Sequence, residues 1–405
     1  MKFIVTLNIV LCYAFAFAQD SVYIKTNYEK FEYMIKMRDG KKLYTAVFVP
    51  RDKSKKYPIL LNRTPYSCQP YGKNAYPNTL GPGNTKKYTD EKFIFVKQDV
   101  RGRFMSEGEF EDVRAFETNK SKKTTIDEAS DTYDAVDWLV KNITECNGKV
   151  GVYGISYPGF YASMAALAYH PAIKAVSPQA PITNWFLGDD VRHNGAFFLF
   201  DTFSFDFVFG KPRYAPTTKW RKGFTYPTPD AYAFYLEHTL KELTEKYMDS
   251  CRFWMEEMAH PNYDAFWKAR DIRPHFKNVK CAVLTVGGLH DAEDCWGGFE
   301  TYKWIEKQNP GIDNKLVEGP WFHGGWARSD GSYFGDIRFG RNTSEDYLNE
   351  LEFPFFMHYL KDEKNYPLAE ATLFDIGADQ WRKFTEWPVK SAVCRFNGGH
   401  NNNRC

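Results

Sequence analysis

The sequence of 405 residues has almost no surplus of charge of either sign. Lys and Arg together number 53 and Asp and Glu number 51, which gives a formal charge of +2, and no long run of one charge occurs. Binding to nucleic acid or to an anionic membrane relies on a clustered positive potential. The composition therefore gives no electrostatic reason to expect a nucleic-acid or membrane partner.

Sequence motifs for metal binding are missing as well. The chain has no C-x-x-C pair and no H-E-x-x-H segment, and its eight cysteines show no metal-type spacing. We therefore predict no metal ion and no cofactor. An exported location would permit a disulfide, but the pairing cannot be read from cysteine spacing.

A long apolar run occurs only at the start of the chain, from Phe3 to Phe17, directly after Lys2. A charged start, a short hydrophobic segment and a small-residue exit are typical of a secretory signal peptide. A membrane anchor is the alternative, although about 15 apolar residues are fewer than the roughly 20 that a span needs. We expect a signal peptide over residues 1–18, a mature protein in the periplasm or outside the cell, and no membrane contact after cleavage.

A strand-turn-helix pattern surrounds Ser156. The strand-like run Lys149–Tyr153 leads into the serine, and a segment rich in helix formers follows it. Gly154 and Gly159 flank the serine, as the strained turn that presents a nucleophile requires. Pro158 breaks the strict G-x-S-x-G spacing, but the first turn of a helix tolerates proline. The pattern predicts a nucleophilic serine, with an ordinary Gly-flanked turn as the alternative.

Two later strand-like runs lead to residues that would complete a catalytic triad. The run Lys280–Val286 leads to Asp291, and a second short strand leads to His323. The order Ser, Asp, His along the chain is that of the α/β-hydrolases. We predict that Ser156 attacks a carbonyl, that His323 transfers the proton, and that Asp291 holds the imidazole. His290 is the alternative base.

Strands and helices alternate along most of the chain, which favours an α/β fold with a mostly parallel sheet. Between about residues 184 and 276 this alternation gives way to aromatic-rich helical segments. We predict that they form a helical cap inserted into one hydrolase domain of residues 19–360, and not a separate domain. The expected elements are strands at Tyr44–Pro50, Tyr57–Asn62 and Phe93–Gln98, and helices at Glu128–Asn142, Ala231–Met248 and Arg252–Met258.

The pattern changes again after Lys361. A strand-like run from Leu368 to Gly377 predicts that a β domain begins within residues 361–393. Residues 394–405 are polar and rich in asparagine, without periodicity, and we expect them to be disordered.

Four segments of the chain resemble the cocaine-esterase and X-Pro dipeptidyl-peptidase family of α/β-hydrolases. Within that family the sequence is most similar to the α-amino-acid ester hydrolases, which cleave and form esters and β-lactam amides of α-amino acids. The resemblance covers nearly all of residues 25–390. It implies a helical cap and a C-terminal jelly roll, of which this chain holds only the start. We expect a truncation or a change of reading frame there, which sequencing of the locus would test. The four segments are Arg63–Tyr66, Asp99–Phe110, Gly154–Gly159 and Gly287–Asp291.

The resemblance also implies roles for particular residues. The family's triad falls on the serine, aspartate and histidine inferred above. Its oxyanion hole falls on the hydroxyl of Tyr66 and the backbone N–H of Tyr157. Its ammonium-binding carboxylates fall on Asp190, Glu293 and Asp294, three acidic residues whose mutual repulsion a bound cation would relieve.

The residues and the resemblance together predict a secreted serine hydrolase. Its substrates would be esters, and β-lactam amides, of small α-amino acids, cleaved through an acyl-enzyme. A cocaine-esterase-like carboxylesterase and an X-Pro dipeptidyl aminopeptidase are alternatives, and a catalytically inactive binding module is an alternative of another class. Relatives form oligomers, so a homo-oligomer is a further expectation of the resemblance.

Overall fold

The computed structural model describes residues 21–83, 86–119, 124–213, 215–366 and 368–390. The predicted signal peptide, residues 1–18, and the predicted disordered tail, residues 394–405, lie outside these ranges. No helix within the described ranges has the length and apolar character that crossing a membrane requires.

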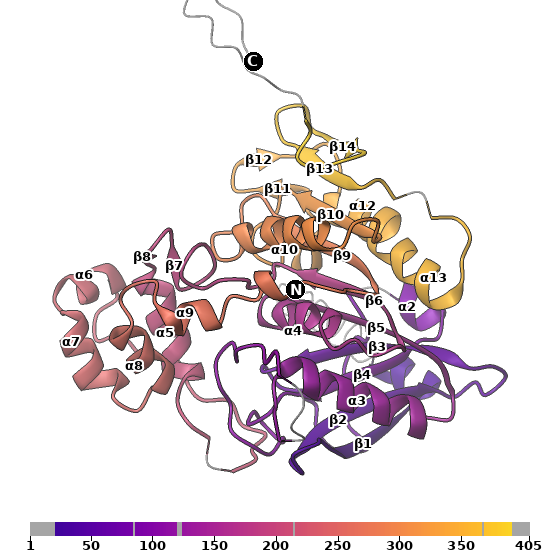
Figure 1. Cartoon of the computed structure of the whole chain (residues 1–405), viewed down its shortest axis with the longest axis horizontal. Helices are drawn as coiled ribbons and strands as arrows, with labels where there is room; N and C mark the ends of the chain where they lie inside the picture. The colour runs from indigo at the N-terminus through magenta and orange to yellow at the C-terminus, as the bar shows by residue number, and fades with distance from the viewer. Residues whose placement is uncertain (1–20, 84–85, 120–123, 214, 367, 391–405) are drawn as a thin grey trace, which may run out of the picture.

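A twisted central sheet organises the molecule (Figure 1). Within the described residues it has ten strands in the order β1-β2-β4-β3-β5-β6-β9-β10-β13-β14. Strands β4 to β13 run parallel to one another, whereas β1, β2 and β14 are antiparallel to their neighbours. The strands are β1 (Tyr28–Lys36), β2 (Lys42–Pro50), β3 (Tyr57–Thr64), β4 (Ile94–Asp99), β5 (Cys146–Ile155), β6 (Ile173–Gln179), β9 (Ala282–Gly288), β10 (Asn314–Gly319), β13 (Ala371–Asp375) and β14 (Gln380–Phe384).

Helices cover both faces of this sheet (Figure 1). Side chains alternate between the two faces along each strand, so β2 contributes Val47 to one core and Phe48 to the other. One face is packed by α3 (Glu128–Asn142), α4 (Tyr157–Ala166) and α10 (Cys295–Gln308). The other is packed by α2 (Lys87–Asp90), α12 (Thr343–Tyr347), the π-helical turn η3 (Leu348–Glu352) and α13 (Phe353–Lys361).

The helix predicted at Glu128–Asn142 has the same bounds as α3. Its start is fixed by a capping box, in which Asp127 Oδ1 accepts the N–H of Ser130 (2.7 Å) and Ser130 Oγ accepts the N–H of Asp127 (2.8 Å). The predicted strands correspond to β2, β3, β4, β5, β9 and β10. Strand β1, which pairs antiparallel with β2, was not predicted.

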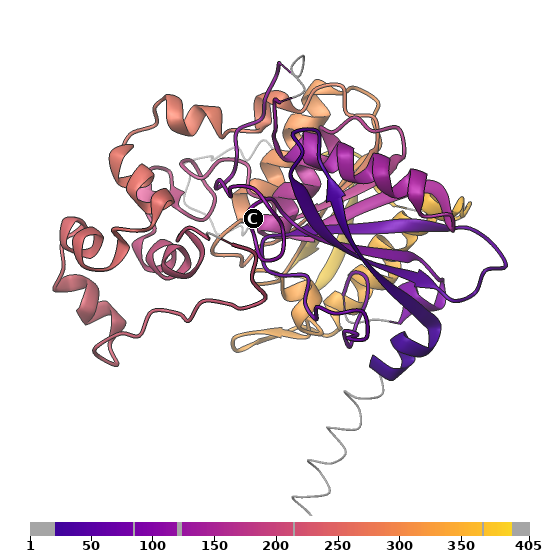
Figure 2. The same cartoon turned by 90° about the horizontal axis from the view of Figure 1, so that it is seen from below.

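The segment predicted as a cap is helical and has a small aromatic core of its own, which includes Phe203, Phe234 and Trp254. Figure 2 shows these helices as a group beside the sheet. The group comprises a short hairpin, β7 (Arg192–His193) and β8 (Ala196–Phe197), then α5 (Leu199–Phe209), α6 (Ala231–Leu236), α7 (Leu240–Leu243), η1 (Thr244–Met248), α8 (Arg252–Ala259), α9 (Ala265–Ala269) and η2 (Arg273–His275).

Strands β13 and β14 occupy the region where the sequence predicts the start of a β domain. Residues Ala371 to Leu373 of β13 pair in parallel with β10, and β14 then pairs antiparallel with β13. Both strands thus extend the central sheet, and their assignment to a jelly roll stays a prediction. Shorter elements lie between β10 and α12 in the chain, namely α11 (Gly325–Arg328), β11 (Tyr333–Phe334) and β12 (Ile337–Arg338).

Candidate active site

Ser156 stands at the sharp turn between β5 and α4, as the local sequence predicts. Its backbone has φ +67° and ψ −130°, a conformation that side-chain-bearing residues rarely adopt. A Cβ on Gly154 would lie 2.3 Å from the carbonyl oxygen of Pro158, and a Cβ on Gly159 would lie 2.4 Å from that of Gln179. Both flanking positions therefore need glycine, because neighbouring backbone fills the space that a side chain would require.

Asp291 and His323 meet at the ends of β9 and β10. Nδ1 of His323 lies 2.8 Å from Oδ2 of Asp291, whose Oδ1 accepts the N–H groups of Glu293 (2.8 Å) and Asp294 (3.0 Å). The two loops can come this close because Gly288 has no side chain. A Cβ at this position would be only 2.4 Å from the carbonyl oxygen of Trp321. The aspartate is thus fixed on one side by backbone donors and presented to the imidazole on the other.

The pKa values of the pair follow from this contact. Burial alone would raise the pKa of Asp291, but its hydrogen bond to His323 and the backbone N–H groups hold the pKa below the ordinary value. Burial alone would lower the pKa of His323, but the hydrogen bond and negative charge of Asp291, with further charges from Glu293 and Asp190, raise it above 6.5. The contact with Asp291 therefore stabilises the protonated imidazole more than water stabilises that of an isolated histidine.

Ser156 and His323 line the same cavity, which has a volume of about 360 Å³. No hydrogen bond joins their side chains among the described residues; Nε2 of His323 instead lies 3.4 Å from Oε2 of Glu293. Contacts between a nucleophile and its base are often looser without substrate than with it. His290, the alternative base, is stacked on the ring of Phe334 with 4.1 Å between centroids, and does not line this cavity.

Two predicted oxyanion donors also reach this cavity. Tyr66 lines the cavity together with Ser156, and burial raises the pKa of its hydroxyl well above the ordinary value, so the phenol stays protonated. Its loop is held by Asp99, which accepts the N–H of Cys68 at 2.8 Å. Tyr157 is the first residue of α4, so its N–H has no acceptor within the helix.

The side chain of Tyr157 has a structural role, unlike its backbone N–H. Its hydroxyl is buried, accepts the N–H of Val113 (2.7 Å) and donates to Asp112 (3.4 Å). The phenol therefore anchors the loop before α3, and only the backbone of this residue is available to a substrate.

The three predicted carboxylates lie together around His323. Asp190 and Glu293 line the cavity, and the fully buried Asp294 has its Oδ2 4.0 Å from Nδ1 of His323. Burial and the charge of Glu293 raise the pKa of Asp190 to about 7, while its Oδ2 accepts the indole N–H of Trp185 (2.8 Å). The N–H of Asp190 donates to the carbonyl of Glu293 (3.0 Å), which ties the cap entrance to the loop after β9.

Comparison with known proteins shows the same family over most of the chain. The family model of the X-Pro dipeptidyl-peptidases (S15 family) matches residues 39–325. The chain belongs to the X-Pro dipeptidyl-peptidase (S15) family. This membership agrees with the resemblance seen in its sequence.

Individual relatives of this S15-family chain are esterases and peptidases. It is 22% identical to the cocaine esterase of Rhodococcus sp. (strain MB1 Bresler), with 88% of this chain and 59% of that protein covered. It is 24% identical to a putative Xaa-Pro dipeptidyl-peptidase of Bacillus anthracis, with coverage of 88% and 56%. The chain thus spans less than two thirds of the length of these relatives.

Two solved structures are similar throughout the described fold. One is an aminopeptidase from a marine sediment archaeon, Thaumarchaeota archaeon (TM-score 0.81, 31% identity, covering 90% of this chain and 60% of that one). The other is an α-amino acid ester hydrolase (TM-score 0.80, 31% identity, covering 89% and 59%). The α/β-hydrolase fold of this S15-family member is therefore shown independently of its sequence motifs.

The cavity of this S15-family protein includes residues that the sequence did not single out. Asp201, Phe205 and Asp206 of α5 line it, as do Phe253 of α8 and Arg328 of α11. The spacing of four between 201 and 205 places these residues on one face of a helix. That spacing predicts a shared face, but not that the face covers the catalytic serine.

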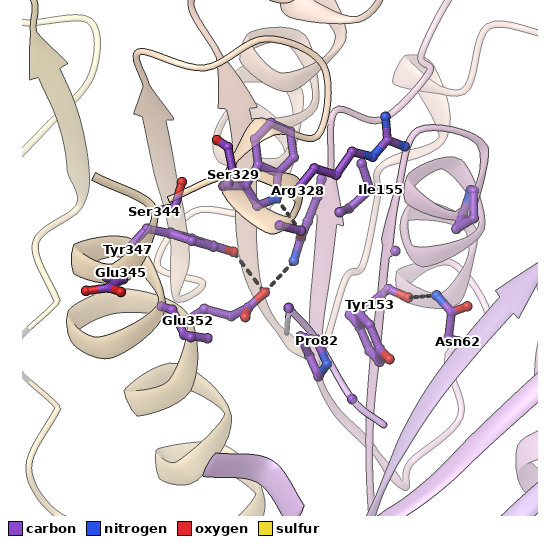
Figure 3. A pocket seen from close by; sticks show the side chains of 18 of the residues that line it. Asn62, Pro82, Tyr153, Ile155, Arg328, Ser329, Ser344, Glu345, Tyr347 and Glu352 are labelled. Carbon is purple, nitrogen blue, oxygen red and sulfur yellow. Dashed lines mark hydrogen bonds between the residues drawn. The ribbon is translucent and has the colours of Figure 1, made fainter. Parts of the chain in front are cut away.

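A second cavity of about 580 Å³ lies behind the turn that carries Ser156, with Gly154 and Pro158 in its wall (Figure 3). Gln179, at the end of β6, accepts the N–H of Ser156 with its backbone carbonyl (2.9 Å). Its side-chain amide donates to Oε1 of the buried Glu352 (2.7 Å). Glu352 thus supports, through one residue, the backbone that holds the serine in place.

Proposed function

We propose that this protein is a serine hydrolase that cleaves esters of small α-amino acids, and amides such as those of β-lactams, through an acyl-enzyme. The observation that carries the proposal is the position of Asp190 and Glu293, which line one cavity with Ser156 and His323. A general carboxylesterase has no use for a cluster of carboxylates at this point, because they repel one another and the oxyanion that forms during the reaction.

In the proposed reaction, Ser156 Oγ attacks the substrate carbonyl while Nε2 of His323 accepts its proton, and Asp291 stabilises the imidazolium. The developing oxyanion receives hydrogen bonds from the hydroxyl of Tyr66 and the N–H of Tyr157. Each such donor contributes roughly 3 kcal/mol to stabilisation of the transition state. The proton then passes to the leaving alcohol or amine, and water, activated in the same way, releases the amino acid.

The substrate's α-ammonium would be bound by Asp190, Glu293 and Asp294. A cation 4 Å from one carboxylate gains about 4 kcal/mol at an effective dielectric constant of about 20. It also offsets the burial and the repulsion by Glu293 that together raise the pKa of Asp190 to about 7. An ammonium that draws Glu293 toward itself would leave Nε2 of His323 free to accept the serine proton.

Covalent labelling tests the nucleophile. A fluorophosphonate probe should label the wild-type protein and should not label the Ser156→Ala variant. Ser163→Ala, which removes a buried hydroxyl of the same helix, is the matched control and should still be labelled. Labelling of the Ser156→Ala protein at wild-type level would remove this serine from the mechanism.

Substrate pairs test amine recognition. Glu293→Gln and Asp190→Asn should raise KM for an amino-acid methyl ester at least tenfold more than for the same ester without its amino group. Equal losses on the two esters would refute the role of the carboxylates.

The names of its relatives support two alternative activities, a cocaine-esterase-like carboxylesterase and an X-Pro dipeptidyl aminopeptidase. A panel of phenylglycine methyl ester, a simple benzoate ester and a Gly-Pro anilide separates them, because each activity prefers a different member. Active-site titration of purified residues 19–405 tests the alternative of a catalytically inactive binding module. Such a module would show no burst of product.

We further propose that the protein acts in the periplasm or outside the cell, because its first 18 residues have the pattern of a signal peptide. Fractionation of cells that express the whole chain tests this location. Sedimentation of the purified protein tests the expected homo-oligomer.

A further inference from the structure

The catalytic cavity contains a carboxyl group that the proposed reaction does not use. Asp206, on α5 of the cap, lines this cavity although only 1% of its surface is exposed. Its Oδ2 is buried without a hydrogen-bond partner among the described residues. Leaving a buried polar atom unpaired costs about 1–3 kcal/mol, so such an atom beside a cavity indicates a missing ligand group.

Several of the side chains around Asp206 are acidic. Burial raises its pKa well above the ordinary value, and the charges of Asp112, from the loop before α3, and Asp201, from the same helix, raise it further. On α8, the buried Glu257 has both carboxylate oxygens unpaired and interacts with Asp206 through its charge. The guanidinium of Arg192 is directed to the backbone carbonyl of Glu257 (3.4 Å) and forms no ion pair with either carboxylate within the described residues. A cationic ligand would favour the ionised form of Asp206 and supply the partner that its Oδ2 lacks.

The rest of the cavity wall selects the shape of that ligand. The cavity wall combines carboxyl groups with apolar side chains, so one ligand can place both a charged end and an alkyl stem there. Long basic side chains combine an apolar stem with a charged end, and they lay the stem along apolar surfaces. The apolar lining residues are Ile155, Ile182, Trp185, Val191, Phe205 and Phe253.

The order of the lining residues along α5 indicates in which direction the cavity extends from the catalytic groups. Burial raises the pKa of Asp201, and the charge of His323 opposes this rise, which places Asp201 near the catalytic end of the cavity. Asp206 follows five residues later, about 7 Å further along the helix axis at 1.5 Å per residue. The cavity thus continues from the catalytic groups along α5 and reaches a carboxyl group at a distance suited to the stem of a Lys or Arg side chain.

We infer that Asp206 is a specificity-determining residue that selects acyl groups of basic amino acids. The substrate's α-ammonium would bind at Asp190 and Glu293, and its side-chain ammonium or guanidinium would pair with Asp206. This inference rests on the proposed function, because it assumes that the acyl group is an amino acid.

Two methyl esters of similar length test the inference, those of lysine and of its neutral counterpart norleucine. The wild-type protein should prefer the lysine ester in kcat/KM, and Asp206→Asn should lower kcat/KM for it roughly 30-fold or more, as expected for the loss of one partner of a buried ion pair. The norleucine ester should be hydrolysed as well as before. Asp206→Leu should reverse the preference, and Asp249→Asn, which removes an exposed carboxylate of the cap, should leave it unchanged.

Three results would overturn the inference. The first is an equal kcat/KM of the wild-type protein for the two esters, and the second is an unchanged preference in Asp206→Asn. The third is a preference for 4-hydroxyphenylglycine methyl ester over the lysine ester, which would indicate a phenol site.

Thermal stabilisation by lysinamide and norleucinamide tests ligand binding at Asp206 independently of ester hydrolysis. If no ester is hydrolysed, the proposed function fails, yet lysinamide should still stabilise the wild-type protein and not Asp206→Asn. A lack of any lysinamide effect on the wild type would remove the pocket as well. The melting temperatures of the unliganded variants show whether they are folded, and Asp206→Leu should be at least as stable as wild type because it removes an unpaired buried carboxyl.

Discussion

Replacement of Glu352 by glutamine should change how the stability of the protein depends on pH. This glutamate is 2% exposed, and its Oε1 accepts hydrogen bonds from the Gln179 amide (2.7 Å) and the Tyr347 hydroxyl (2.9 Å) (Figure 3). Its Oε2 accepts a hydrogen bond from the Tyr88 hydroxyl (3.4 Å). Glutamine keeps the shape and the carbonyl acceptor, and its amide can donate to Tyr88. The substitution thus removes the titratable group and preserves the network.

The size of the effect follows from the pKa of the carboxyl group. Burial raises the pKa of Glu352 from 4.5 to about 7 in the folded protein, despite the hydrogen bonds that lower it. The folded state then holds a proton that the unfolded state has lost between pH 4.5 and about 7, so the free energy of unfolding falls as pH rises through this window. At about 1.4 kcal/mol per pKa unit, the loss amounts to about 3 kcal/mol.

Urea unfolding of both proteins at pH 5 and pH 8 measures this loss. Other buried carboxyl groups contribute equally to both proteins, so the difference between them isolates Glu352. The stability of Glu352→Gln relative to wild type should increase by about 2–3 kcal/mol from pH 5 to pH 8. Glu345→Gln, which removes an exposed carboxylate at the rim of the same cavity, is the control. A difference that does not change with pH would refute the assignment of a protonated Glu352.

Three further predictions concern the catalytic groups. Tyr66→Phe removes one oxyanion donor and should lower kcat on an amino-acid ester by about 10²–10³-fold with little change in KM, which steady-state kinetics will show; an unchanged kcat would exclude the hydroxyl. Asp291→Asn should lower kcat by on the order of 10⁴-fold while circular dichroism stays unchanged, because the imidazole loses the partner that fixes its tautomer. Because the pKa of His323 is raised and the base must be neutral, kcat/KM should fall as pH decreases with a midpoint above 6.5; a midpoint below 6.5 would contradict the contact with Asp291.

Local sequence patterns identified most of the elements in the hydrolase domain. The alternation of apolar residues in a strand and the residues that cap a helix act over a few neighbours, so they can be read without knowledge of the fold. The cap was harder, since the single predicted helix Ala231–Met248 is divided into α6, α7 and η1. Thr239 begins α7 with a capping box to Glu242, a signal that the sequence contains and that marks the break.

The candidate site likewise depends partly on local sequence and partly on tertiary structure. The turn at Ser156 and the strand ends before Asp291 and His323 follow from local sequence, because glycine requirements and strand periodicity are short-range effects. The positions of Asp206 and Glu352 followed only from the tertiary structure. Asp206 faces the catalytic cavity because α5 of the cap lies against the loops that carry the catalytic groups, and Glu352 reaches Gln179 because the segment from α12 to α13 packs on one face of the sheet. Which side chains face one another across such packing depends on contacts between distant segments, and no periodicity within either segment encodes its partner.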